Sequence, residues 1–262
     1  MASEASRKTM TFEEGWPFLQ VGVDKLIGII EGAHSNQFTS EEYMQLYTTV
    51  YTICAPNPIG PEVQKLYDQY KKTFEDYITS KVLPSLHGEK DEILLKELAK
   101  RWEDHKVMTR WLSRFFHYLD RYFLARRKLP TTSETSFMLF YKLVYGELND
   151  QVRDAVLSMI DREREGQQID EALVKNVLNI YLEMAESAKK YYEKDFEEAM
   201  LKSTATFAKE RASSWIASES HDDYLLKVLE HELVLEHELR TLCASKLAET
   251  KDSDGEAAET DK

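Results

Sequence analysis

Apolar residues recur at steps of three and four along most of the chain, and this periodicity limits the possible folds more than any other feature. In the first such stretch, Trp16, Leu19, Val23, Leu26 and Ile30 fall on one side of a helix. No stretch shows the alternation that is typical of a strand. The 9 Gly and 6 Pro in 262 residues are fewer than a β-sandwich or barrel normally needs. The sequence therefore predicts an all-α protein with more than about 60% helix.

Capping and turn residues divide this pattern into separate helices. Gly32 offers a stop for the first helix, and Thr39 or Ser40 can cap the second, with Glu42 in its first turn. Residues 1–10 and the small, acidic residues of 250–262 are expected to be disordered. The predicted helices cover residues 12–30, 40–54, 62–83, 89–106, 107–127, 134–148, 150–164, 170–184, 188–202, 207–216 and 222–249.

Charge and cysteine content exclude several classes of function. A net charge of −13 repels phosphates, so no nucleic-acid partner is expected. Cys54 and Cys243 are too few and too far apart for a disulfide framework or a zinc site. The sequence shows neither a secretory signal nor an apolar run long enough to span a membrane. We therefore expect a location in the cytoplasm and nucleus, with no membrane partner.

No motif for catalysis or cofactor binding is present. There is no Gly-rich phosphate loop and no G-x-S-x-G elbow. His231 and His237 lie in a repeated Glu-His-Glu-Leu sequence, but they are six residues apart and thus on opposed faces of a helix, whereas a helical zinc site needs a spacing of four. The basic run 126–128 fits either a helix end or a nuclear-import signal. We expect a non-enzyme without metal or cofactor.

Six segments of the chain share their order and spacing with those of a known family: YMQLYTTVY at 43–51, RWEDHK at 101–106, WLSRFFHYLDRYF at 111–123, DREREGQQID at 161–170, YYEKDFE at 191–197 and ASSWI at 212–216. Together they resemble a cullin, the scaffold of multisubunit ubiquitin ligases. The second segment is similar to the junction before the fifth helix of that family, and the third to the fifth helix in its plant form. After Lys227 the sequence departs from the family pattern.

The resemblance implies stacked five-helix repeats that form a curved rod. Residues 11–148 would form the first repeat, which in this family docks a Skp-family adaptor and, through it, an F-box protein. Residues 149–249 would form a second, incomplete repeat. The globular domain that recruits a RING-box subunit is expected to be missing, so that the chain competes with full-length cullins. The alternative is an architectural helical-repeat protein that has lost its adaptor site.

The resemblance also implies where the adaptor binds, on the second and fifth helices. The second helix carries more large apolar residues than one buried stripe requires, and partner surfaces favour Tyr, Met and Arg. Any one of these aromatic residues could equally belong to the core. The predicted adaptor-binding residues are Tyr43, Met44, Tyr47 and Val50 on the second helix and Arg114, Tyr118 and Arg121 on the fifth.

Overall fold

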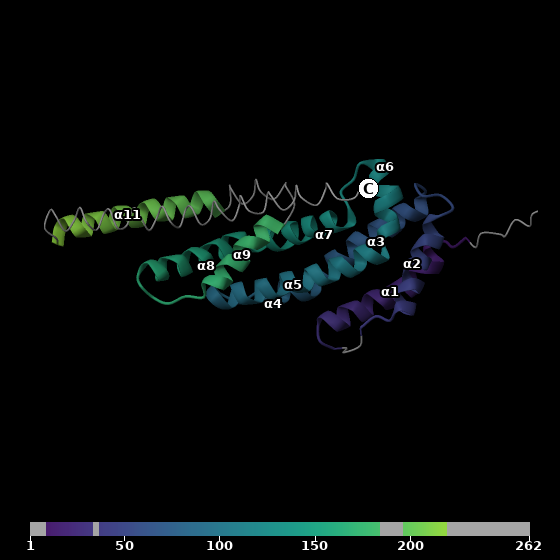
Figure 1. Cartoon of the computed structure of the whole chain (residues 1–262), viewed down its shortest axis with the longest axis horizontal. Coiled ribbons are helices and arrows are strands. Elements are labelled where there is room, and N and C mark those ends of the chain that lie inside the picture. Colours follow the sequence, from purple (N-terminus) through teal and green to yellow (C-terminus); the bar gives the residue numbers. More distant parts are fainter. Residues whose placement is uncertain (1–8, 34–36, 184–195, 219–262) are drawn as a thin grey trace, which may run out of the picture. The chain divides into compact units, whose positions relative to one another are not determined.

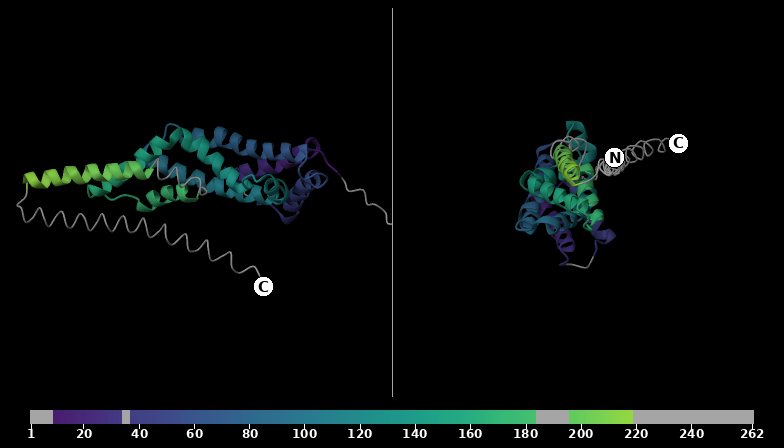
Figure 2. Two further views of the ribbon diagram at one scale, coloured as in Figure 1. Left: turned by 90° about the horizontal axis from the view of Figure 1, so that it is seen from above. Right: turned by 90° about the vertical axis from the view of Figure 1, so that its left-hand side faces the viewer.

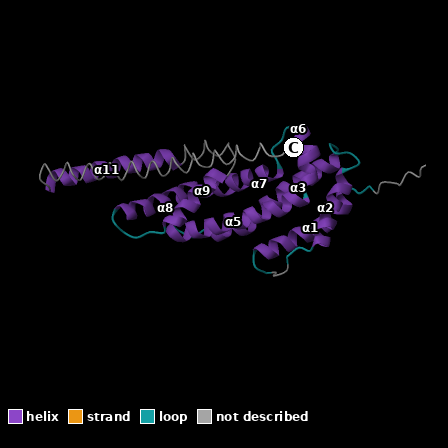
Figure 3. Cartoon of the chain, in the orientation of Figure 1, coloured by secondary structure: helices purple, strands orange, loops and turns teal. Residues whose placement is uncertain are grey.

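The computed structural model describes residues 9–33, 37–183 and 196–218, and every regular element in these ranges is a helix (Figures 1 and 3). The all-α prediction is therefore confirmed for this part of the chain. No helix within it is both long enough and apolar enough to cross a membrane. The chain divides into two units, of which the first ends at Glu198 and the second begins at Ala199.

The first two helices begin and end where their capping residues predict. Helix α1 spans Phe12–Ile30 and helix α2 spans Ser40–Cys54. Each begins with a capping box, in which the threonine hydroxyl before the helix accepts a hydrogen bond from the backbone N–H of Glu14 or Glu42, and that glutamate reaches back to the threonine N–H. Gly32 follows α1 with a φ of +74°, a conformation that costs glycine little.

Small residues bring α1 and α2 close together, and the two helices lie side by side (Figure 2). Gly15 and Gly22 are buried on the side of α1 that faces α2. A Cβ atom at Gly15 would lie 2.6 Å from Ile53 Cδ1, and one at Gly22 would lie 2.6 Å from Leu46 Cδ2. Alanine does not fit at either position unless α2 side chains shift, so these glycines set the distance between the helices.

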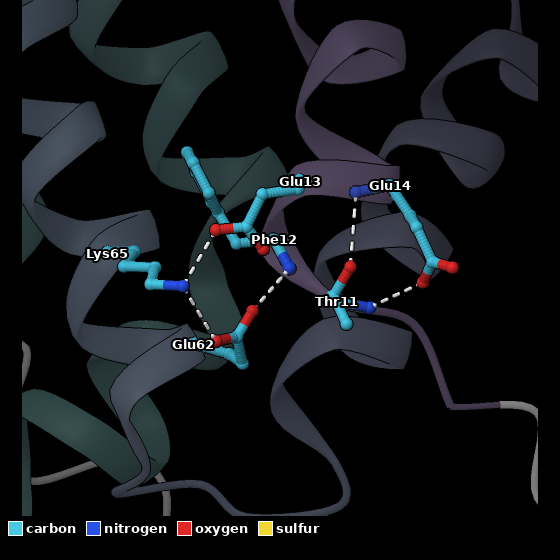
Figure 4. A network of polar contacts seen from close by, with 6 residues as sticks. All are labelled: Thr11, Phe12, Glu13, Glu14, Glu62 and Lys65. Carbon is cyan, nitrogen blue, oxygen red and sulfur yellow. Dashed lines mark hydrogen bonds and ion pairs between the residues drawn. The ribbon is translucent and has the colours of Figure 1, made fainter.

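A polar network fixes the start of α1 against helix α3, which spans Pro61–Tyr77 (Figure 4). The backbone N–H of Phe12 donates to Glu62 Oε2 at 2.6 Å, and Lys65 Nζ contacts Glu13 at 2.7 Å and Glu62 at 3.0 Å. The hydrogen bond from Lys65 lowers the pKa of the Glu13 carboxyl. This network satisfies a backbone donor that the helix itself leaves unpaired.

Helix α3 continues into the π-helix η1 (Ile78–Val82) and helix α4 (Leu83–Leu86), and the run ends before Gly88 at φ +90°. One side of this run is buried in the core. Pro84 does not end the run as predicted, because it lies in the first turn of α4, where no backbone N–H is required. The buried residues of this run include Leu66, Tyr70, Phe74, Tyr77 and Ile78.

One continuous helix, α5 (Asp91–Phe115), replaces the two helices that were predicted to meet at residues 106 and 107. That boundary was wrong because neither glycine nor proline stands there to interrupt the helix. The helix ends instead at Phe115, and the carbonyl of the next residue, Phe116, accepts the N–H of Leu119 in a tightened turn. The π-helix η2 (Leu119–Leu124) and the short helix α6 (Ala125–Arg127) follow.

A second long run begins with helix α7 (Thr132–Phe140) and continues through the π-helix η3 (Tyr141–Tyr145) into helix α8 (Gly146–Arg164). The break predicted between residues 148 and 150 is absent because no proline or helix-ending glycine lies there, whereas Gly166, at φ +84°, ends the run as expected. The proposed division into repeats at 148 and 149 thus falls within a helix, and the repeats remain a prediction.

Helix α5 is the central element of the first unit and contacts both α8 and α9 (Glu171–Glu183), which are labelled next to it in Figure 1. Trp102 Nε1 on α5 donates to Glu183 Oε2 at 2.7 Å, and Lys106 Nζ lies 3.0 Å from the same carboxylate. Helix α11 (Glu198–Ser218) begins at the last residue of the first unit, and the rest of it belongs to the second unit. The predicted helix over 222–249, the two histidine repeats, Cys243 and the acidic tail lie outside the described residues.

A buried histidine lies in the aromatic core between α5, α3 and α7. His105 is 0% exposed, and its ring packs against Phe74, Trp102 and Phe140 with centroids 4.8 to 5.8 Å apart. Its Nε2–H donates to the Ser136 carbonyl at 3.1 Å, while Nδ1 has no partner. Burial lowers the pKa of His105 from an ordinary value of 6.5 to about 3, so the imidazole is neutral at physiological pH.

Candidate partner-binding site

The outward side of α2 carries an unusually exposed set of large side chains. Met44 is 54% exposed and Tyr51 is 43% exposed, while Tyr43 and Tyr47 are half-buried. Val50 differs from the prediction, because its side chain is 0% exposed and lies in the core. A partner docked on α2 therefore cannot reach Val50, and we remove it from the candidate site.

Ring contacts hold the amino-terminal end of α2 against α5. Phe38, just before α2, lies 5.1 Å from Trp111 and 5.2 Å from Phe115, measured between ring centroids. Tyr43 lies 5.8 Å from Phe115. Such contacts add to the stability that burial alone provides. Part of the Tyr43 side chain thus packs between α2 and α5, and the rest is exposed.

Four tyrosines gather where the carboxyl-terminal half of α2 meets η2, and we call them the tyrosine cluster: Tyr47, Tyr51, Tyr118 and Tyr122. The Tyr118 ring meets the Tyr51 ring edge-on at 5.4 Å and lies 4.4 Å from the Tyr122 ring. Burial, followed by the nearby Tyr122, the Cys54 thiol, Tyr51 and Tyr47, raises the pKa of the Tyr118 phenol. The fold therefore brings predicted residues from both helices, Tyr47 and Tyr118, to one place.

The predicted arginines lie on both sides of the tightened turn at Phe116, and Arg121 contacts the tyrosine cluster. Arg114 on α5 and Arg121 on η2 are exposed, and the Arg121 guanidinium lies 5.3 Å from the centroid of the Tyr122 ring. The burial pattern keeps its helical period through the turn, since Leu112, Phe115 and Leu119 are all buried. Exposed basic residues therefore occur on both sides of the turn, while the site formed by Arg114, Tyr118 and Arg121 remains a prediction.

An apolar groove of about 580 Å³ runs along the other side of α2, between α2 and α1. Met44 borders it, as does Phe18 of α1, which is 42% exposed. Met44 therefore lies between the groove and the tyrosine cluster and could contact a partner on either side of α2. The remaining lining residues are Met10, Glu14, Gly15, Glu41, Gln45, Thr48 and Thr49.

Sequence reasoning missed several residues that share this surface. Tyr51 and Tyr122 complete the tyrosine cluster, Phe38 supports Tyr43 through Phe115, and Phe18 borders the groove. The step of four from Tyr47 to Tyr51 and from Tyr118 to Tyr122 was a usable signal, because such neighbours meet on one helix face. No comparable signal marked Phe18, since no aromatic residue lies three or four positions away from it on α1.

The surface on α2 and η2 has the composition of a protein contact surface. No group of three or more His, Cys, Asp or Glu side chains within them could hold a metal ion. Cys54 is buried as a free thiol, and burial raises its pKa to about 12, so it is not a nucleophile at neutral pH. What the arrangement provides is a contact surface of exposed aromatic, methionine and arginine side chains, the types that carry most binding energy in protein interfaces.

Sequence comparison with known proteins points to a single family. Cullin-1 of rice (Oryza sativa subsp. japonica) is 48% identical over 94% of this chain, which spans 36% of that protein. Two Arabidopsis thaliana proteins are each 43% identical to this chain. The match to putative cullin-like protein 2 covers 92% of this chain and 66% of that protein. The match to cullin-like protein 3 covers 82% of this chain and 83% of that protein. The chain thus spans about a third of rice Cullin-1. Residues 16–252 match the cullin alpha solenoid domain, a fold of stacked helical repeats, and the chain therefore belongs to the cullin family.

Proposed function

We propose that this chain is a scaffold arm that binds a Skp-family adaptor of SCF ubiquitin ligases and, through it, an F-box protein. The observation that carries the proposal is the exposed surface on α2 and η2, where Met44 and the tyrosine cluster lie beside Arg114 and Arg121. The likeness to rice Cullin-1 supports the same role. We propose that Tyr43, Met44, Tyr47 and Tyr118 fill apolar pockets on the adaptor, and that the two arginines pair with acidic groups at its rim.

The direct test is complex formation between the purified chain and a purified Skp-family adaptor. We expect a stable pair on size-exclusion chromatography and a Kd of about 1 μM or tighter by calorimetry, since interfaces with several buried aromatic anchors commonly reach this range. An unrelated helical protein of similar charge is the control. No heat of binding at high adaptor concentration would favour the architectural alternative, in which the adaptor site has been lost.

We further propose that a chain of these 262 residues withholds adaptors from full-length cullins. When the chain is produced in excess in cells, F-box substrates are expected to have longer half-lives, because adaptor bound to it cannot join a productive ligase. Pulse-chase measurement of two substrates of different F-box proteins is the test, and a variant that does not bind adaptor is the control. Unchanged half-lives, despite adaptor captured on the chain, would reject this role.

A further inference from the structure

Helix α7 buries hydroxyl groups where a surface helix normally buries apolar side chains. The Thr135 hydroxyl shares a hydrogen bond with the Tyr67 hydroxyl at 3.2 Å, and the Ser136 hydroxyl shares one with the Thr109 hydroxyl at 2.7 Å. Because these groups are paired, their burial is tolerated, and α7 is held against α3 and α5 partly through hydrogen bonds. The buried residues of α7 are Thr132, Thr135, Ser136 and Phe140.

The outward side of α7 and η3 carries an apolar side chain between two opposite charges. Glu134, Met138 and Lys142 are the exposed residues between Thr132 and Tyr145, and they follow one another at steps of four. Met138 is 49% exposed. The half-buried apolar residues beside this line are Phe137, Leu139, Tyr141 and Leu143. The outward side is thus apolar at its centre, acidic at one end and basic at the other.

Neither charge at the ends of this line is compensated by an opposite charge. Within the part of the chain that the structure describes, Lys142 has no ion pair. The Glu134 carboxylate accepts hydrogen bonds from the Thr131 N–H and hydroxyl, at 2.7 and 2.9 Å, but has no cation beside it. Glu134 and Lys142 are separated by about 12 Å along the helix axis, too far to pair with each other.

A stripe of this kind is complementary to a reversed copy of itself. A two-fold axis through Met138 would place Glu134 of each copy against Lys142 of the other, and the two Met138 side chains would meet at the axis. We infer that α7 and η3 form an isologous contact with a second copy of this chain, in which the two helices run antiparallel. This contact lies apart from the adaptor surface on α2 and η2 and does not depend on the proposed function.

The contact should be weak and reversible. The run from α7 through η3 has 9 and 5 residues and spans about 21 Å, so two such runs bury less than the roughly 800 Å² per partner of a standard interface. Two chains with a net charge of −13 also repel each other at long range, although salt screens this repulsion more than it screens charges in contact. We expect a Kd on the order of 100 μM at physiological ionic strength.

The experiment uses two variants of the full chain, Glu134→Lys and Lys142→Glu. Each variant alone turns both crossing pairs of the dimer into pairs of like charge. In the mixture, a chain that is basic at both positions faces a chain that is acidic at both, which restores the two pairs. Lys90→Glu is the control, because Lys90 is exposed, precedes α5 and changes the net charge as Lys142→Glu does.

Sedimentation velocity over a range of concentrations gives the Kd of each variant and of the mixture. Circular dichroism checks that the variants keep their helicity. In Glu134→Lys the Thr131 hydroxyl can still accept the backbone N–H of residue 134, so the cap of α7 is kept in part.

We expect the original chain and Lys90→Glu to dimerise alike, and each α7 or η3 variant alone to dimerise about tenfold more weakly, since two like-charge pairs replace two attractive ones. The mixture should regain the Kd of the original chain. A monomeric original chain at every concentration would overturn the inference, as would equal Kd values for these variants and Lys90→Glu. A mixture that stays as weak as the single variants would also overturn it, because antiparallel pairing requires the restoration.

Discussion

Met44→Ala is expected to weaken adaptor binding about 30-fold while leaving the free energy of unfolding nearly unchanged. Met44 is 54% exposed in the free chain and lies between the tyrosine cluster and the groove, so a docked adaptor would bury it near the centre of the contact. Truncation of a central anchor typically costs about 2 kcal/mol of binding energy, which corresponds to the stated factor. Calorimetry with the adaptor and a thermal melt of the free chain measure the two quantities.

Val50→Ala, in the same helix, should show the opposite pattern. Val50 is fully buried, so the smaller side chain leaves a cavity and costs roughly 2 kcal/mol of stability, while adaptor affinity at a temperature well below the melt stays the same. Comparison of the two variants thus distinguishes a residue that contacts the adaptor from a residue of the core on the same helix. Normal binding by Met44→Ala would remove this residue from the site, and a large drop in its melting temperature would assign it to the core.

Lowering the pH from 6.5 to 5 should destabilise the protein by about 2 kcal/mol through His105 alone. In the unfolded chain the imidazole takes up a proton near pH 6.5, whereas in the folded chain burial holds its pKa at about 3. The stability that His105 contributes is therefore present in full above pH 6.5 and is lost as the pH falls toward 3, at about 1.4 kcal/mol per pH unit. A proton on Nδ1 would also find no acceptor, because that atom has no hydrogen-bond partner.

The measurement is the difference in unfolding free energy between the original chain and His105→Gln, by urea titration at both pH values. Carboxylates titrate alike in both proteins, so the difference isolates the buried imidazole. His87→Gln is the matched control, because His87 is exposed and contacts Glu147 at the surface. A difference that does not vary with pH would show that His105 is accessible to protons in the folded state.

The helices were predictable where local chemistry marks their ends. Thr11, Thr39 and Thr131 each form a capping box with a glutamate three residues later, and the glycines at 32, 88 and 166 take up positive φ. Sequence reasoning failed where a boundary lacked such a marker. The turn at Phe116 arises between residues that are themselves good core residues, Phe115 and Leu119, and no glycine or proline announces it.

The sequence indicated which helices carry large surface side chains, but not which of these side chains are exposed. Periodicity shows that Tyr43, Tyr47 and Val50 lie on neighbouring sides of α2, but it does not show that α1, α3 and α5 all pack around that helix. Those contacts bury Val50 and leave Met44 and Tyr51 at the surface. Which side of an amphipathic helix is covered depends on partners distant in the sequence, and this information is absent from the local pattern.

The continuity of α5 sets the geometry of any assembly built on this arm. Its 25 residues span about 38 Å in one unbroken ladder of backbone hydrogen bonds. The same helix contacts α2 near one end and α8 and α9 toward the other. A straight helix resists bending far more strongly than a joint between two helices does, so a docked adaptor would hold a constant position relative to α8 and α9. Helix α5 would thus fix the distance between the docked adaptor and α8 and α9. Inserting residues into α5 would rotate and displace the adaptor relative to these helices, by amounts that the helix pitch of about 5.4 Å determines.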